Sequence, residues 1–223
     1  MTILHHLDQT TLLRYASGDL DEAFSVVVAA HLAMCDECRR ELRIAEDIGG
    51  RLLEESEMAT VSDGAFSRIM CRIDEAEASG ETILAAPPIA LRGGKQDVPS
   101  TLQRYIGTRL ADISWKTVAP GVRRHKIALS TPTRSALYML KIEPGKAVPE
   151  HGHGGTEMTL ILSGAYRDAL GRFGPGDLAD LDEHVEHQPR VEPGEPCVCL
   201  VATEAPTRFK GIFSRLLQPL VGI

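Results

Sequence analysis

The amino-acid sequence predicts a chain of two parts, a helical N-terminal domain and an all-β C-terminal domain. Two patterns carry this prediction: apolar residues recur with a period near 3.6 up to about residue 77, and after residue 101 they fall in short runs between Pro/Gly turns. Residues 79–100 contain several Pro and Gly and no sustained periodicity, which is typical of a linker. We therefore expect a helical domain over 1–78, a linker over 79–100 and a β-barrel or sandwich over 101–223.

Three helices are expected in the first 52 residues. Asp8 is placed to cap the first and Gly18 to end it, and a second begins near Asp21. A third follows Cys35 and runs past the Gly pair at 49–50, which is expected to loosen it.

A fourth helix is expected after Thr60-x-x-Asp63, which fits a capping signal, and it runs to about Glu77. Its apolar residues form one stripe, made of Phe66, Ile69, Met70 and Ile73.

The strands of the second part are marked by apolar runs at 136–142, 158–162 and 197–202. Turn signals separate them, among them Pro144-Gly145 and Gly174-Pro175-Gly176. This spacing of short strands indicates an all-β barrel or sandwich.

Charge is divided unevenly along the chain. Residues 1–85 hold 7 Lys and Arg against 17 Asp and Glu, a net charge of −10, whereas residues 86–223 hold the other 17 and 14, a net charge of +3. Direct nucleic-acid binding by the first part is not expected, because phosphate contacts need clustered Lys and Arg. An acidic module suits a basic protein partner instead.

The chain is expected to be cytoplasmic. It has no N-terminal apolar segment of the signal-peptide kind and no apolar run near the roughly 18 residues of a membrane span. Its odd number of cysteines does not fit a secreted disulfide framework; they are Cys35, Cys38, Cys71, Cys197 and Cys199.

The spacing His31-x3-Cys35-x2-Cys38 predicts a metal site. Residues four apart share one face of a helix, so His31 and Cys35 point to the same place, and Cys38 follows where the chain bends. Three such ligands suit tetrahedral zinc. The fourth ligand is expected from His5 or His6, and a redox-active cysteine pair is the rival interpretation.

These residues, together with Leu12-Leu13-x-Tyr15 and Gly18-x-Leu20, resemble the zinc-binding anti-sigma domain over residues 5–75. The resemblance implies zinc ligands His6, His31, Cys35 and Cys38. It also implies that the helices grip a sigma factor of the extracytoplasmic-function type, with Phe66, Ile69, Met70 and Ile73 in contact with it.

A second metal motif reads Gly145-x5-His151-x-His153-x3-Glu157-x6-Gly164. Alternation in a strand places His151 and His153 on one side, and Glu157 can enter the same cavity. Two imidazoles and a carboxylate are compatible with Zn, Fe, Mn, Ni or Cu. The string resembles the first cupin motif, which implies a cupin barrel holding zinc or another divalent transition metal.

The second cupin motif should supply one more histidine. His187 is favoured over His184, although neither matches the usual spacing from the turn at 174–177. Downstream, Cys197 and Cys199 share one side of a strand. If both face inward, they are candidates for redox or regulatory thiols.

A zinc anti-sigma domain followed by a cupin resembles the ChrR-type anti-sigma factors. This resemblance implies a regulator, not an enzyme, that forms a 1:1 complex with its sigma factor and releases it under oxidative stress, with singlet oxygen or organic peroxides as signals. Two alternatives are a cupin metalloenzyme of dioxygenase or isomerase type and a metal- or redox-storage protein. The sequence offers no clear acid/base pair for the enzyme reading.

Overall fold

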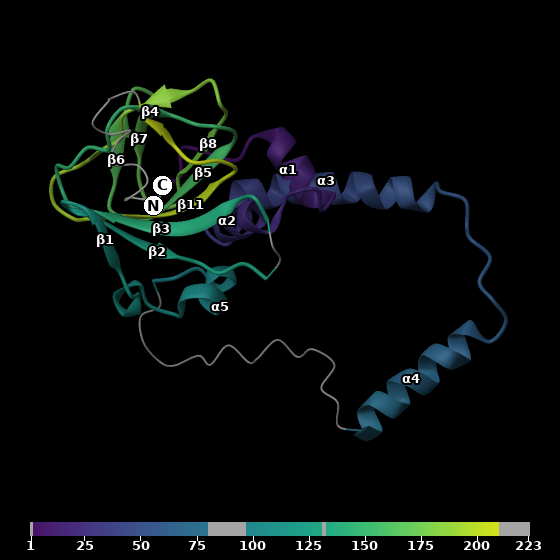
Figure 1. Ribbon diagram of the computed structural model, residues 1–223. Coiled ribbons are helices and arrows are strands. Elements are labelled where there is room, and N and C mark those ends of the chain that lie inside the picture. Colours follow the sequence, from purple (N-terminus) through teal and green to yellow (C-terminus); the bar gives the residue numbers. More distant parts are fainter. Residues whose placement is uncertain (1, 80–96, 131–132, 210–223) are drawn as a thin grey trace. The chain divides into compact units, whose positions relative to one another are not determined.

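A computed structural model describes residues 2–79, 97–130 and 133–209 (Figure 1). Four helices come first, followed by short helical turns and a set of β-strands, which confirms the predicted fold class. The four helices are α1 (Gln9–Ala16), α2 (Glu22–Leu32), α3 (Asp36–Glu54) and α4 (Ala65–Ser79).

Side-chain caps fix where the first two helices begin. Asp8 accepts a hydrogen bond from the amide of Thr10 at 2.7 Å, and Asp21 accepts one from Ala23 at 3.0 Å. After α1 the chain turns at Gly18, whose φ of 75° suits glycine. Helix α3 runs through the glycine pair at 49–50 without a break.

Three short helical turns precede the sheets: η1 (Ser100–Leu102), α5 (Gln103–Ile106) and η2 (Leu110–Asp112). The main sheet has six strands in the order β1-β2-β3-β11-β5-β8. They are β1 (Lys116–Ala119), β2 (Val122–Lys126), β3 (Ala136–Ile142), β11 (Cys197–Thr203), β5 (Glu157–Ser163) and β8 (Leu178–Leu181).

Two three-stranded sheets complete the barrel, in the orders β10-β6-β7 and β12-β4-β9. The first holds β10 (Arg190–Val191), β6 (Tyr166–Asp168) and β7 (Gly171–Phe173). The second holds β12 (Arg208–Phe209), β4 (His151–Gly152) and β9 (Glu186–His187).

The central strands of the main sheet are buried on both faces. In β11, Leu200 packs in a core with the helices, whereas Cys199 and Val201 pack in a second core inside the barrel. Strand β3 alternates in the same way, with Met139 on the helical side and Tyr138 on the inner side. Burial of both faces explains why these strands are nearly continuous apolar runs.

Helix α2 covers the outer face of this sheet, where it contacts β3, β5 and β11 (Figure 1). Eight of its eleven residues are buried, because the helix is apolar on nearly all sides. Helix α1 also contacts this sheet, because Thr11 Oγ1 donates a hydrogen bond to Asp180 Oδ2 in β8 at 2.7 Å. The described residues up to Gly49 and those from 97 onward thus form one compact unit.

Residues from Gly50 to the end of α4 belong to a second unit. No residue of α4 is buried, and its apolar side chains form a stripe along one side. Among the described helices, none is both long enough and apolar enough to cross a bilayer.

Candidate metal centres

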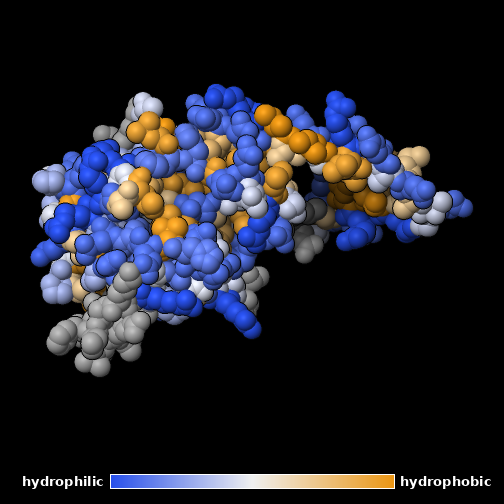
Figure 2. Space-filling view, turned by 90° about the horizontal axis from the view of Figure 1, so that it is seen from above, coloured by the Kyte–Doolittle hydropathy of each residue, from blue (hydrophilic) through white to orange (hydrophobic). Residues whose placement is uncertain are grey.

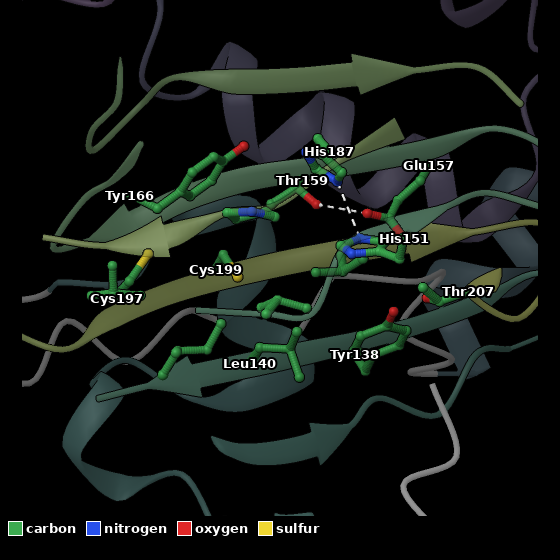
Figure 3. A pocket seen from close by; sticks show the side chains of 15 residues that line it. Tyr138, Leu140, His151, Glu157, Thr159, Tyr166, His187, Cys197, Cys199 and Thr207 are labelled. Atoms are coloured by element: carbon green, nitrogen blue, oxygen red, sulfur yellow. Dashed lines mark hydrogen bonds between the residues drawn. The ribbon is translucent and has the colours of Figure 1, made fainter. Parts of the chain in front are cut away.

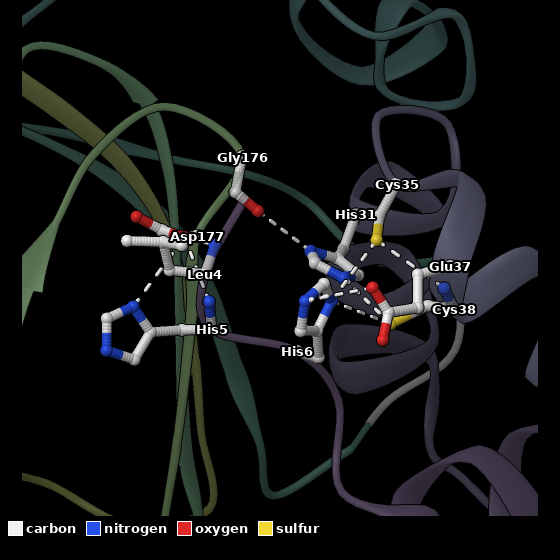
Figure 4. Close-up of polar contacts among 9 residues, drawn as sticks. All are labelled: Leu4, His5, His6, His31, Cys35, Glu37, Cys38, Gly176 and Asp177. Carbon is white, nitrogen blue, oxygen red and sulfur yellow. Dashed lines mark hydrogen bonds and ion pairs between the residues drawn. The ribbon is translucent and has the colours of Figure 1, made fainter. Parts of the chain in front are cut away.

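The first cluster forms where the N-terminal segment meets the α2–α3 bend. His31 lies in the last turn of α2, Cys35 in the bend and Cys38 in the first turn of α3. The extended segment before α1 contributes His6. One ligand atom from each of the four lies within 4.8 Å of all the others (Figure 4). We call these four residues the clasp.

The clasp geometry suits a tetrahedral ion. His31 Nε2 lies 3.2 Å from Cys38 Sγ, and His6 Nδ1 lies 3.3 Å from Cys35 Sγ and 3.6 Å from Cys38 Sγ. Two sulfurs and two imidazole nitrogens are a ligand set that structural zinc favours. Of the two N-terminal histidines, the structure brings His6 to the cluster, whereas the ring of His5 stacks on Phe173 with centroids 4.0 Å apart.

Burial shifts the pKa of two clasp residues, His31 and Cys38. It lowers the pKa of His31 to about 4, although a hydrogen bond to the Gly176 carbonyl opposes the shift. The ring is therefore neutral near pH 7, as a metal ligand must be. Burial also raises the pKa of the Cys38 thiol to about 11, and the neighbouring Cys35 adds to this. A thiolate at this buried position therefore needs a cation beside it.

The second cluster lies inside the barrel and consists of His151, His153, Glu157 and His187. Strand β4 pairs with β9 so that His151 stands opposite His187, and their Nε2 atoms are 3.1 Å apart. His153 follows β4, and its Nδ1 lies 3.4 Å from an oxygen of Glu157 at the start of β5. One ligand atom from each again lies within 4.8 Å of the others. We call these four residues the barrel cluster.

Outer hydrogen bonds orient two of these histidines. Nδ1 of His151 bonds the carbonyl of Pro149, and Nδ1 of His187 bonds Asp168, both at 2.8 Å. Each ring then presents Nε2 to the cluster, which is the arrangement typical of metal-binding histidines. His184, the alternative considered from sequence, is exposed and instead lies 3.9 Å from the carboxylate of Glu183.

A buried ring nitrogen without a hydrogen-bond partner also fits a metal ligand in the barrel cluster. Nε2 of His153 is buried and makes no hydrogen bond within the described part of the chain. Burial lowers the pKa of His151 to about 4, so this ring is neutral near pH 7. Burial would raise the pKa of Glu157, but the hydrogen bond and charge of His153 together lower it. Three imidazoles and a carboxylate match a divalent transition metal.

A cavity of about 60 Å³ opens beside the barrel cluster (Figure 3). His151, Glu157 and His187 line it together with apolar and sulfur-bearing side chains. Cys197 and Cys199 both face this cavity, which decides between the two orientations that the sequence left open. The hydrogen bond with Cys197 raises the pKa of Cys199 well above its usual range, and burial adds to this.

Sequence reasoning missed the hydroxyl-bearing side chains of this cavity, among them Tyr166. Tyr166 in β6 lines it, and its buried hydroxyl has no hydrogen-bond partner among the residues that the structure describes. The strand is only three residues long, so the pattern gives no alternation from which to place the ring.

Comparison with known proteins bears on the whole chain. Residues 103–206 match the family described as the ChrR Cupin-like domain. Anti-sigma-E factor ChrR of Cereibacter sphaeroides is 41% identical, with 100% of both chains covered. The chain belongs to the ChrR family of anti-sigma factors. The resemblance that the sequence suggested is thereby confirmed, and the family is one of regulators, not enzymes.

One solved structure agrees with membership of the ChrR family over nearly its whole length. The complex of Rhodobacter sphaeroides SigE with the anti-sigma ChrR matches with a TM-score of 0.75 and 40% identity, covering 91% of this chain and 99% of that one. The structure of KdgF from Halomonas sp. matches with a TM-score of 0.38 and 22% identity, covering 45% of this chain and 92% of that one.

The helices of this ChrR-family chain expose apolar side chains. On α4, Phe66 is 76% exposed and Ile69 56%, and Met70 and Ile73 are each 40% exposed. Helix α3 carries a second exposed stripe that sequence reasoning did not assign to a partner: Ile44, Ile48 and Leu52. Apolar patches of this kind stand out among the hydrophilic surface in Figure 2. Contiguous exposed apolar stripes mark interaction surfaces.

Proposed function

We propose that this chain is a cytoplasmic anti-sigma factor that binds a sigma factor of the extracytoplasmic-function type in a 1:1 complex. In this proposal, the helices hold the sigma factor in an inactive arrangement, and the barrel releases it under oxidative stress. We propose that residues 1–78 bind the sigma factor, that 79–100 form a linker and that 101–223 sense the signal.

The exposed stripe of α4 is the observation that carries the binding role. Four apolar side chains lie at positions i, i+3, i+4 and i+7, and helices of this pattern dock in hydrophobic grooves of a partner. The surrounding region is strongly acidic, with a net charge of −10 over residues 1–85. A sigma factor presents basic DNA-binding faces, which this charge attracts and covers.

Metal assignments follow from ligand chemistry. The clasp, with two thiols and two imidazoles, is proposed to hold zinc, which would supply folding free energy to the helices. The barrel cluster is proposed to hold zinc or another divalent transition metal. In the clasp, His31 and His6 would present Nε2 and Nδ1 to the ion, and in the barrel His151 and His187 would present Nε2.

Sensing is proposed to occur in the barrel cavity, with singlet oxygen or an organic peroxide as the signal. Cys197 and Cys199 share this cavity with the barrel cluster and are candidate redox thiols. Because the raised pKa of Cys199 keeps this thiol protonated near pH 7, it reacts slowly on its own.

Co-purification with the sigma factor tests the binding role. The full-length chain is co-expressed with a candidate extracytoplasmic-function sigma factor, preferably one encoded beside it, and the complex is measured by size exclusion and metal analysis. We expect a 1:1 complex that Ile69→Asp disrupts, weakening affinity about 100-fold because the charge enters a buried apolar contact.

Cys71→Asp is the matched control, because it adds the same charge to an exposed position elsewhere on α4. It should weaken binding by no more than about twofold. Absence of any complex with metal-loaded protein would contradict the anti-sigma role and return attention to enzymatic activity in the barrel cavity.

A further inference from the structure

The N-terminal segment connects a barrel turn to the clasp (Figure 4). The amides of Leu4 and His5 donate hydrogen bonds to Asp177 Oδ1 at 2.7 and 3.0 Å. The carbonyl of His5 accepts a hydrogen bond from the amide of Leu178 at 3.2 Å. The next residue along the segment is His6, a member of the clasp. The backbone that carries this ligand is therefore fixed to the barrel, one residue before the ligand itself.

The turn at 174–177, between β7 and β8, is shaped to receive this segment. Asp177 is 4% exposed, and its second oxygen accepts a hydrogen bond from the amide of Gly174 at 2.8 Å. At Gly176, with φ of +90°, an added Cβ would lie 2.7 Å from the side chain of Ile3. The absence of a side chain at this position lets the N-terminal segment lie directly against the turn.

The same turn also touches the clasp directly. Nδ1 of His31 donates a hydrogen bond to the carbonyl of Gly176 at 2.9 Å. This bond places the ring proton on Nδ1 and leaves Nε2, which lies 3.2 Å from Cys38 Sγ, to face the metal position. A carbonyl or carboxylate that orients a histidine in this way commonly changes metal affinity 10- to 100-fold.

We propose that the barrel turn at 174–177 is the outer shell of the clasp, with Asp177 as its positioning residue, so that the barrel sets how tightly the helices hold zinc. This inference rests on the zinc clasp proposed above. Both histidines of the clasp depend on the turn, His31 through the Gly176 carbonyl and His6 through the segment that Asp177 holds. A movement of this one turn therefore acts on two of four ligands at once.

Stacked rings continue the contact toward the barrel cavity. His5 stacks on Phe173, and Phe173 stacks on Tyr166 with centroids 4.9 Å apart. Tyr166 lines the cavity beside the barrel cluster. From the same strand, Asp168 bonds His187 of that cluster. A change at the barrel cluster thus reaches the turn through β6 and β7, which pair with each other.

Thiol reactivity in the full-length, metal-loaded chain tests the inference. Because the barrel cluster contains no cysteine, the rate at which Cys35 and Cys38 are alkylated, read by peptide mass spectrometry, reports zinc exchange at the clasp alone. We expect Asp177→Ala to accelerate this alkylation at least 10-fold. Asp177→Asn, which retains an acceptor oxygen, should fall between Asp177→Ala and the unmodified chain.

Thr11→Val is the matched control, because it removes another hydrogen bond between the helices and the barrel, to Asp180, without touching the segment or the turn. It should change the alkylation rate by less than about twofold. Equal acceleration by Thr11→Val would overturn the proposal, because any loosening of the interface would then have the same effect. An unchanged rate in Asp177→Ala would overturn it as well.

A second variant protects the test against misfolding of the turn. His5→Ala removes the stack on Phe173 and the 3.6 Å contact of the ring with Asp177 Oδ1, and it leaves the bond between Gly174 and Asp177 in place. Retained barrel metal shows that the barrel is intact, and several-fold faster alkylation supports the proposal, whereas an unchanged rate overturns it. If a chelator does not alter the alkylation of the unmodified chain, the zinc clasp itself is overturned, and the inference with it.

Discussion

The clasp and the barrel cluster each gather four ligands, yet they differ in chemistry and surroundings. The clasp combines two thiols with two imidazoles at the junction of helix ends, whereas the barrel cluster combines three imidazoles with a carboxylate beside a cavity. Four protein ligands with two sulfurs are typical of structural zinc, which stabilises a fold. Harder ligands beside open space are typical of sites where a small molecule approaches the metal. The difference supports the proposal that the first site stabilises the fold and the second one senses the signal.

Removing a clasp ligand should have the largest effect. Cys38→Ala is expected to abolish zinc retention at the clasp and to lower the Tm of the helices, because structural zinc supplies on the order of 10 kcal/mol of folding free energy in small domains. Sigma binding should be lost with it. Circular dichroism melting and zinc analysis measure both effects. Cys71→Ala, at an exposed position, should change neither, and a Cys38→Ala chain that keeps its zinc would contradict the structural role.

Removing a barrel ligand should separate sensing from binding. His153→Ala is expected to lose the barrel metal while leaving the resting affinity for the sigma factor within about twofold, because the ring is buried and belongs neither to the clasp nor to the exposed stripes. Release of the sigma factor by peroxide should then disappear. Titration of the complex with and without oxidant checks this expectation. A variant that binds the sigma factor as weakly as Cys38→Ala would erase the distinction between the two sites.

The buried hydroxyl of Tyr166 in the cavity allows a test with a smaller expected effect. Tyr166→Phe removes a buried hydroxyl that has no partner in the described structure, so the free energy of unfolding should rise by about 1 kcal/mol. Urea denaturation measures this change. Tyr105→Phe is the opposite case, because that hydroxyl donates a hydrogen bond to Glu22 at 3.2 Å, and its loss should lower stability by a similar amount. A loss of stability in Tyr166→Phe would show that the hydroxyl has a partner after all.

The smallest effect is expected at Asp180, which accepts a hydrogen bond from Thr11. Burial raises the pKa of this carboxyl above 3.8, although the hydrogen bond from Thr11 opposes the shift. Its stabilising form is the neutral one, present at low pH and lost as pH rises through the folded pKa. Asp180→Asn should therefore raise the free energy of unfolding at pH 7 by up to about 1 kcal/mol and give no gain at pH 3. Equal gains at both values would exclude this cause.

Local patterns in the sequence predicted most of the parts. Caps at Asp8 and Asp21 marked the starts of two helices, and the spacing of His31, Cys35 and Cys38 was enough to indicate a metal cluster. Choices between neighbouring histidines were harder. Which of His5 and His6 joins the clasp depends on the direction in which the extended segment runs. Asp177 fixes that direction by hydrogen bonds to the segment, and it lies more than 170 residues away in the sequence.

The docking of the helices on the barrel was not predicted, although a signal for it existed. Helix α2 is apolar on nearly all sides, and a helix of this kind is buried all round. Strand β11 is a nearly continuous apolar run without the polar alternate positions of a solvent-facing strand. The helix and the strand each need apolar residues to cover them, and each covers the other. Single elements can be assigned one by one, whereas this match appears only when elements from both halves are compared.

The burial of α2 also has a thermodynamic consequence. A helix with eight buried residues that belongs to the same apolar core as the outer face of the sheet cannot leave it without exposing both surfaces to water. Helix α2 and the barrel should therefore melt in one calorimetric transition, without the separate peaks of independent modules. Detachment of whole halves is then too costly to serve as the response to a signal. If the chain senses oxidants as proposed, the response is expected to be a displacement of ångström size within the unit that α2 shares with the barrel.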